Sequence, residues 1–171
     1  MSFQFKTTLD NFLKLRKALK FLKENSVYVG ISEDTSDRED EDKATGVTNA
    51  ELLFIHTNGS PINNIPPRPV IEPALKEDSE RISQMMKKAG ELAMEGKESE
   101  AIQQLKKTGM RGQNVSRAWF TNPNNNWPPN SPSVAAAKRA KGSTDPKPLI
   151  DTGELRKSIT YFVSQRGMRI K

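Results

Sequence analysis

The 171-residue chain contains no cysteine and only one histidine, His56. The lack of cysteine excludes disulfide bonds, thiolate metal sites and a cysteine nucleophile. A single histidine cannot supply the several nitrogen ligands that a zinc site without cysteine needs, and a serine–histidine–acid triad would have to use this one residue. The sequence also has no Gly-x-Ser-x-Gly nucleophile elbow and no phosphate-binding glycine loop. We therefore expect no metal, no cofactor and no enzymatic activity.

Apolar residues are also scarce, at 34% of the chain, and the mean hydropathy is -0.72. No apolar run approaches the roughly 20 residues that span a bilayer. The first residues, 1–6, lack the basic and then apolar order of a signal peptide, so we expect no membrane association and an intracellular protein. The length favours a single domain over residues 1–171, with a small core and long polar segments ordered by partner subunits.

Charge is distributed unevenly along the chain, whose net charge is +6. Residues 33–42 contain seven acidic side chains and one arginine, whereas residues 103–171 contain thirteen lysines or arginines and three acids. The acidic run predicts a mobile loop over residues 33–47, because it has almost no apolar groups to bury. The basic half fits either a solvated surface or a surface for nucleic acid or an acidic protein.

Local patterns predict several helices and a small sheet. Apolar residues recur at helical spacing from Leu9 to Leu22, which predicts an amphipathic helix beginning near Thr8 or Asp10. β-branched and aromatic runs at 27–31 and 159–163 predict two strands that pair with each other. The fold class is therefore α+β, with a small antiparallel sheet packed against several helices.

Further helices follow from their end signals. Thr48 and Glu51 have the spacing of a capping box before a short buried helix that stops at Asn58-Gly59. Pro73 suits the first turn of a helix running to Gly96, and a second helix is expected to end before Gly109. Residues 60–69 carry four prolines, which predict an extended loop with the Arg68 side chain on a stiff stem.

Residues 110–148 have little periodicity beyond a short helix at 134–140. A connection of this length in a compact domain is usually functional or ordered by a partner. We expect Trp119, Phe120 and Trp127 to anchor this segment by packing on the chain itself. After it, Asp151, Thr152 and Gly153 predict a tight turn, because Asp and Thr side chains bond nearby N–H groups and glycine accepts a positive φ. This triplet also matches that of aspartic proteases, but it lies near the end of a helix-rich chain and has no second catalytic element.

Three segments, in order, resemble the tail-component or tail-completion proteins of tailed bacteriophages, including Mu-like virion morphogenesis proteins. Residues 49–59 resemble an apolar helix of the form A-x-x-x-E-x-G, and residues 65–75 resemble I-P-x-R-P-F-L-x-P-A. The last segment joins Trp-Pro-Pro-Asn-Ser-Pro at 127–132, through a variable basic stretch, to Leu-Ile-Asp-Thr-Gly-Glu-Leu-Arg-Lys-Ser-Ile at 149–159. It resembles W-x-P-x-x-P … K … L-x-D-T-G-x-L-x-x-S-I. The chain departs from the pattern where Val70-Ile71 replaces an aromatic residue and Ser133-Val134 replaces a threonine.

The resemblance implies a structural virion protein that completes or caps the tail and joins it to the head at the neck. It implies a homo-oligomeric ring, with a hexamer as one candidate, that is assembled in the host bacterial cytoplasm. The implied partners are the tail terminator, the tail tube and the head–tail connector, with DNA passing through the lumen without specific binding. The alternative is a nucleic-acid-binding assembly module that uses the basic C-terminal half.

Under this hypothesis, residues 65–75 and residues 127–158 supply contacts between subunits or to the neck. The expected structural turn is Asp151, Thr152 and Gly153. The interface candidates are Ile65, Pro66, Arg68, Pro69, Trp127, Arg156 and Lys157.

Overall fold

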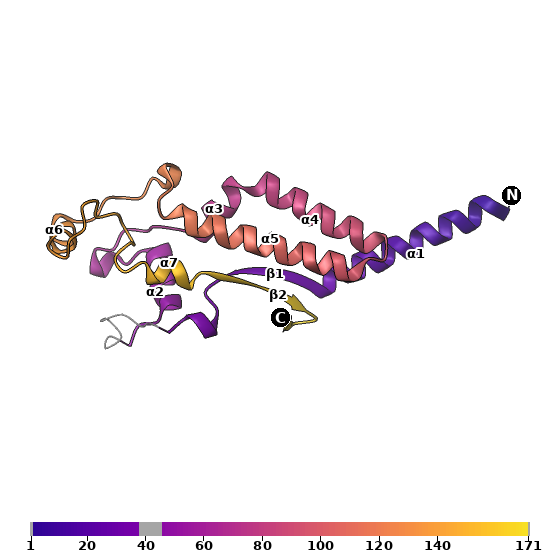
Figure 1. Cartoon of the computed structure of the whole chain (residues 1–171), viewed down its shortest axis with the longest axis horizontal. Helices are drawn as coiled ribbons and strands as arrows, with labels where there is room; N and C mark the ends of the chain where they lie inside the picture. Colours follow the sequence, from indigo (N-terminus) through magenta and orange to yellow (C-terminus); the bar gives the residue numbers. More distant parts are fainter. Residues whose placement is uncertain (1, 38–45, 171) are drawn as a thin grey trace. The chain divides into compact units, whose positions relative to one another are not determined.

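The computed structural model of the chain describes residues 2–37 and 46–170, with side chains from residue 10 onward (Figure 1). Its helices and small antiparallel sheet confirm the α+β class. The α-helices are α1 (Ser2–Glu24), α2 (Asn49–Asn58), α3 (Ile71–Glu77), α4 (Ser79–Met94), α5 (Glu98–Trp119), α6 (Pro132–Ala140) and α7 (Glu154–Ser158). The strands are β1 (Asn25–Gly30), β2 (Thr160–Gln165) and β3 (Met168–Ile170), and the short 3-10 helices are η1 (Glu33–Thr35), η3 (Pro61–Asn63) and η4 (Pro123–Asn125).

The chain divides into two compact units, each assembled from segments that are distant in the sequence. Unit 1 comprises Met1–Tyr28, Asp78–Gly112 and Tyr161–Lys171, and unit 2 comprises Val29–Glu77 and Gln113–Thr160. Each unit has its own cluster of buried apolar side chains. The single tail-completion domain expected for the whole chain stays a prediction.

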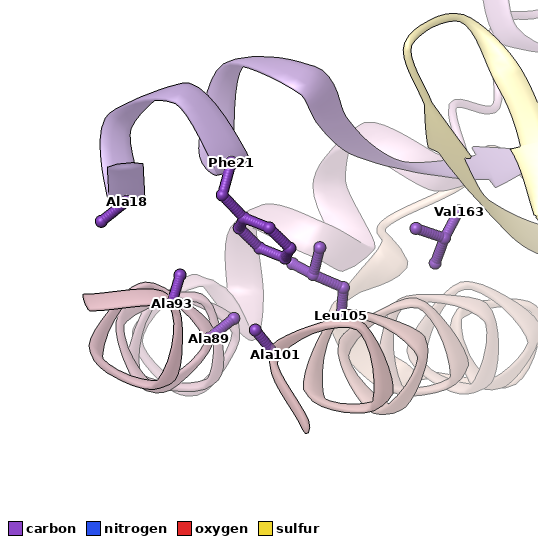
Figure 2. Close-up of a cluster of buried hydrophobic side chains, with 7 residues drawn as sticks. All are labelled: Ala18, Phe21, Ala89, Ala93, Ala101, Leu105 and Val163. Carbon is purple, nitrogen blue, oxygen red and sulfur yellow. The ribbon is translucent and has the colours of Figure 1, made fainter. Parts of the chain in front are cut away.

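The core of unit 1 lies where α1 meets the α4–α5 hairpin. Figure 2 shows Ala18 and Phe21 of α1 pointing toward small side chains of α4 and α5, which allow the helices to approach closely. The buried residues of this core are Ala18, Phe21, Ala89, Ala93, Ala101, Leu105 and Val163.

The three strands lie in the order β1-β2-β3, which confirms the expected pairing of the two predicted strands. Tyr28 and Phe162 stack across neighbouring strands, with ring centroids 4.9 Å apart. β2 and β3 are antiparallel, with Val163 opposite Ile170. The hairpin between them turns at Arg166 and Gly167, both with positive φ, as two-residue hairpin turns require. The short third strand was not predicted.

Several helix boundaries differ from the expectations. α1 begins at Ser2 rather than near Thr8, because no proline or glycine interrupts the preceding residues. The helix expected from Pro73 to Gly96 is two helices, since the backbone of Asp78 leaves helical geometry at φ -95° and ψ 13°. α5 does not stop at Gly109 but continues to Trp119, so residues 110–119 of the expected loop are helical.

In unit 2, a second apolar cluster packs α3, the end of α5 and α7 around aromatic side chains. Trp119 and Phe120 are buried, and the Trp127 ring meets Phe120 edge-on at 5.7 Å between centroids. This confirms that these aromatics anchor the segment by packing on the chain. The buried members of the cluster are Val70, Ala74, Trp119, Phe120, Leu155 and Ile159.

Other local expectations have mixed outcomes. The capping box is present, with Thr48 accepting from the N–H of Glu51 and Glu51 accepting from that of Thr48, but α2 is not well buried, since Phe54 is 70% exposed. The proline segment contains a 3-10 turn, because Pro61 occupies the first turn, where it needs no N–H partner. The short helix at 134–140 is confirmed as α6.

Most of the acidic loop, residues 38–45, lies outside the described residues. Its first residues, Glu33–Thr35, form η1. None of the helices in the described part of the chain combines the length and apolar content needed to cross a membrane.

Candidate functional site

Unit 2 contains a cavity of ≈ 780 Å³ where α2, the proline segment, α6 and the turn before α7 come together. All three segments that carry the family resemblance contribute to its wall. Its charged and histidine lining residues are His56, Arg68, Lys138, Asp151 and Glu154. Its other lining residues include Asn49, Leu52, Asn63, Asn64, Ile65, Pro66, Pro129, Asn130, Ser131, Ser133, Val134, Leu149, Thr152, Gly153 and Leu155.

The proline segment is fixed to the end of α2 by a close backbone approach. Gly59 caps α2 at φ 75°, and a Cβ atom there would lie 2.9 Å from the carbonyl oxygen of Ile65. The N–H of Arg68 then donates to the carbonyl oxygen of His56 at 2.5 Å. These contacts hold Arg68 and His56 on the same wall of the cavity.

Arg68 is only 6% exposed and joins the proline segment to the Trp-Pro-Pro segment. Its Nε and Nη2 donate to the carbonyl oxygen of Pro128 at 3.1 and 2.9 Å, and Nη2 also donates to that of Pro129 at 2.9 Å. The Trp127 indole N–H completes the junction by donating to the carbonyl oxygen of Pro69 at 3.0 Å. Arg68 and Trp127, two of the seven interface candidates, therefore hold segments of unit 2 together.

Lys138 connects α6 to the segment before the turn. Its ammonium group donates to the carbonyl oxygens of Lys147, at 2.9 Å, and Ile150. Burial lowers the pKa of Lys138; the charge of Asp151 acts in the opposite direction and that of Arg68 in the same direction. Lys138 and Arg68 both line the cavity.

The Asp-Thr-Gly triplet forms a turn, as predicted. Gly153 has φ 79° and precedes α7, and the Thr152 hydroxyl accepts from the N–H of Glu154 at 3.4 Å. The Asp151 carboxylate is half-exposed and lies 3.6 Å from the ammonium of Lys141. This geometry is that of a structural turn with a surface ion pair.

His56 is the one imidazole in the chain, and its environment favours the neutral form. Burial lowers its pKa, and the positive charge of Arg68 lowers it further. The Nδ1 atom is buried and has no hydrogen-bond partner in the described part of the chain.

α7 is held at its C-terminal end by side chains from elsewhere in unit 2. Arg117 donates from Nε to the carbonyl oxygen of Ile159 at 2.9 Å and from Nη2 to that of Lys157 at 2.6 Å. Thr35 donates to the carbonyl oxygen of Ser158 at 2.9 Å. Arg156 and Lys157 lie on this helix but do not line the cavity, unlike Ile65, Pro66 and Arg68.

The described residues contain no cluster of three or more metal-ligating side chains. Among the described residues, the Nδ1 atom of His56 has no hydrogen-bond partner. The cavity lining has two cationic groups, one half-buried imidazole and several amides, which together suit non-covalent binding of a polar ligand.

Sequence reasoning found Arg68 and the Asp-Thr-Gly turn but missed Lys138 and the amide residues. Lys138 lies in a basic stretch that gives no sign of which lysine turns inward. Asn130 donates to the carbonyl oxygen of Pro146 at 2.7 Å. It follows several other asparagines in a segment whose composition predicts only a loop, so nothing in the sequence distinguishes it from them.

Searches against models of protein families, against curated proteins and against solved structures found no match for this chain.

Proposed function

We propose that this chain is a structural virion protein of a tailed bacteriophage, which completes or caps the tail and joins it to the head as a ring. One observation carries the proposal. The three segments that resemble tail-completion proteins are residues 49–59, 65–75, and 127–132 with 149–159. Each of them contributes residues to the wall of one cavity in unit 2.

Exposed apolar side chains give the proposal physical support. Phe12, Leu15 and Leu19 of α1 are 60%, 45% and 59% exposed, and Ile62 of the proline segment is 94% exposed. Apolar groups that gather on one helix, as on α1, mark surfaces that a partner covers. A subunit of a ring would bury them against its neighbours or against the tail.

The chemistry of the turn is also in keeping with a structural role. An aspartic protease needs two carboxylates that share a proton. The partner of Asp151 in this structure is the Lys141 ammonium, at the molecular surface. Assembly would then occur by stoichiometric binding to the terminator, tube and connector proteins, without turnover.

The proposal is tested by inactivating the gene in its phage with a nonsense codon. We expect filled heads and separate tails in electron micrographs, and rescue of joining when the purified protein is added to the lysate. Normal virions from the nonsense mutant would overturn the proposal. A lysate of a phage mutant in the major capsid gene is the control, because its defect arises before heads and tails are joined.

A further inference from the structure

The charge of Arg68 in the unit 2 cavity is not neutralised in the way that buried charges usually are. Arg68 is 6% exposed, yet its hydrogen-bond partners are the carbonyl oxygens of Pro128 and Pro129, and none of the described carboxylates lies within ion-pair distance of it. Buried charges are normally paired or bound to a ligand, because an unpaired charge is costly to remove from water.

The donors of Arg68 are only partly used. A guanidinium group has five N–H donors, and those on Nε and Nη2 are directed at the two proline carbonyls. In the described residues Nη1 has no hydrogen-bond acceptor. Lys138, likewise, uses two of its three donors on backbone carbonyls. Both side chains therefore keep donors for a ligand after completing their structural bonds.

His56 provides a second, independent sign of a ligand. Its Nδ1 atom is buried without a partner among the described residues, and the ring lines the same cavity. A buried polar atom without a partner costs about 1–3 kcal/mol unless a ligand or water satisfies it. His56 lines the cavity together with Arg68, so a ligand that enters beside Arg68 also meets the imidazole ring.

The other residues of the cavity wall indicate which class of ligand supplies the hydrogen-bond acceptor. Leu52, Ile65, Val134, Leu149 and Leu155 offer apolar surface, whereas the cavity's asparagine side chains can each donate to and accept from a peptide backbone. The volume of ≈ 780 Å³ lies within the range of about 300–1,000 Å³ typical of ligand pockets.

Two acidic residues in the cavity lining, Asp151 and Glu154, disfavour a ligand with many negative charges. Asp151 faces Lys141, and Glu154 lies at the start of α7, so the wall is not uniformly positive. A strand of nucleic acid with a charge on every phosphate would meet these carboxylates. A single carboxylate on an otherwise neutral peptide would not require them to move.

We propose that this cavity is a docking site for a peptide segment of another protein, which inserts one aspartate or glutamate carboxylate between Arg68, Lys138 and His56. Arg68 and Lys138 bind the carboxylate, and His56 donates to it. The apolar and amide walls hold the flanking residues of the peptide. The inference rests on the proposed role as an assembly subunit, and it identifies the kind of segment that a neighbouring virion protein contributes.

The test uses the purified, untagged full-length chain and pools of acetylated octapeptides that carry one fixed central residue. We expect the glutamate- and aspartate-centred pools to bind at least about tenfold more tightly than the glutamine-centred pool, the size of effect that a lost charged hydrogen bond produces. Because His56 is the one histidine, its ring signals are unique in the proton spectrum, and acidic peptide should raise its titration midpoint.

Two neighbouring basic residues of α6 provide a matched pair of variants. Lys138→Gln should weaken acidic-peptide binding about tenfold or more, whereas Arg139→Gln, at an exposed position outside the cavity lining, should not. Melting curves of both variants establish that they are folded.

Equal binding of acidic and glutamine pools, no saturable binding at low salt, or equal effects of the two variants would overturn the inference. Preferential binding of inorganic phosphate or an oligothymidylate would also overturn it in favour of a phosphate site. None of these outcomes bears on the nonsense-mutant assay, which decides the tail-joining proposal separately.

Discussion

Tyr161 lies with its ring against the backbone of Gly109, so closely that a Cβ atom at position 109 would be 2.3 Å from the ring carbon Cδ2. Both residues belong to unit 1, where α5 packs beside β2. Gly109 thus leaves room for the Tyr161 ring and does not end the helix. Gly109→Ala should destabilise the protein by about 1–3 kcal/mol through overpacking, which outweighs alanine's helical advantage of about 0.5–1 kcal/mol.

The measurement is urea unfolding followed by circular dichroism, with Gly90→Ala as the matched control. Gly90 is also inside a helix, but its nearest neighbour, Leu22 Cδ1, would lie at an ordinary 3.6 Å from the added Cβ. The control should therefore be neutral or stabilising. Equal effects of the two substitutions would show that the Tyr161 contact does not restrict position 109.

Gly109 also illustrates what the sequence could and could not predict. Signals that act within a few residues, such as the Thr48 capping box and the Asp151–Gly153 turn, were read correctly. The space at Gly109 is taken by the ring of Tyr161, more than fifty residues away, and no local pattern contains that contact. For the same reason the apolar spacing of α1 predicted a helix but not that Phe21, rather than Leu19, is buried.

The sequence singled out some of the residues that line the cavity, but not the cavity itself. The proline segment and the Asp-Thr-Gly turn were singled out because proline and glycine restrict the backbone locally. The inward direction of Lys138 depends on the carbonyls of Lys147 and Ile150, which α6 meets only after folding. The cavity residues that could not be predicted from the sequence are therefore those whose role is set by tertiary contacts.

The ion pair between Asp78 and Arg111 should stabilise unit 1 measurably. Arg111 donates from Nε and Nη2 to the two carboxylate oxygens at 2.7 and 2.6 Å, and the Asp78 side chain is 17% exposed. Asp78→Asn should cost about 1–3 kcal/mol in unfolding free energy, as expected for hydrogen bonds to a charged group. The exposed pair of Glu95 and Lys97 is the control, and Glu95→Gln should change little.

The same pair gives an acid dependence with a definite sign. Hydrogen bonds from Arg111 hold the pKa of Asp78 below its usual 3.8. Its contribution is therefore complete above that value and is lost as the pH falls through the lower pKa of the folded state. A stability difference between wild type and Asp78→Asn that does not shrink toward pH 2 would contradict this assignment.

His56 should make the folded protein less stable as the pH falls below about 6.5. Burial, and then the charge of Arg68, lower its pKa below the usual 6.5, so the unfolded chain takes up a proton that the folded chain does not. The neutral imidazole's contribution is complete above that pH and declines below it. Because no other histidine is present, His56→Gln should flatten the unfolding free energy between pH 7.5 and 5.5 in urea titrations. An unchanged slope in the variant would exclude His56 as the source.

The apolar stripe of α1 should drive self-association. Phe12, Leu15, Leu19 and Leu22 follow at spacings of three, four and three residues, the repeat of a helix seam, and all are at least 38% exposed. Leu19→Ser should lower the association constant measured by sedimentation equilibrium, with a loss of less than about 0.5 kcal/mol in monomer stability, because little of the side chain is buried within the chain.

Lys17→Ser is the control for the stripe, since it alters the same exposed helix away from the apolar positions. If the stripe joins subunits, only Leu19→Ser shifts the distribution toward monomer, and removing one positive charge by Lys17→Ser leaves it unchanged or favours the oligomer by reducing repulsion. A wild-type chain that is monomeric at every concentration would contradict both this prediction and the ring. Oligomers that persist in Leu19→Ser would instead assign the ring contact to a surface other than α1.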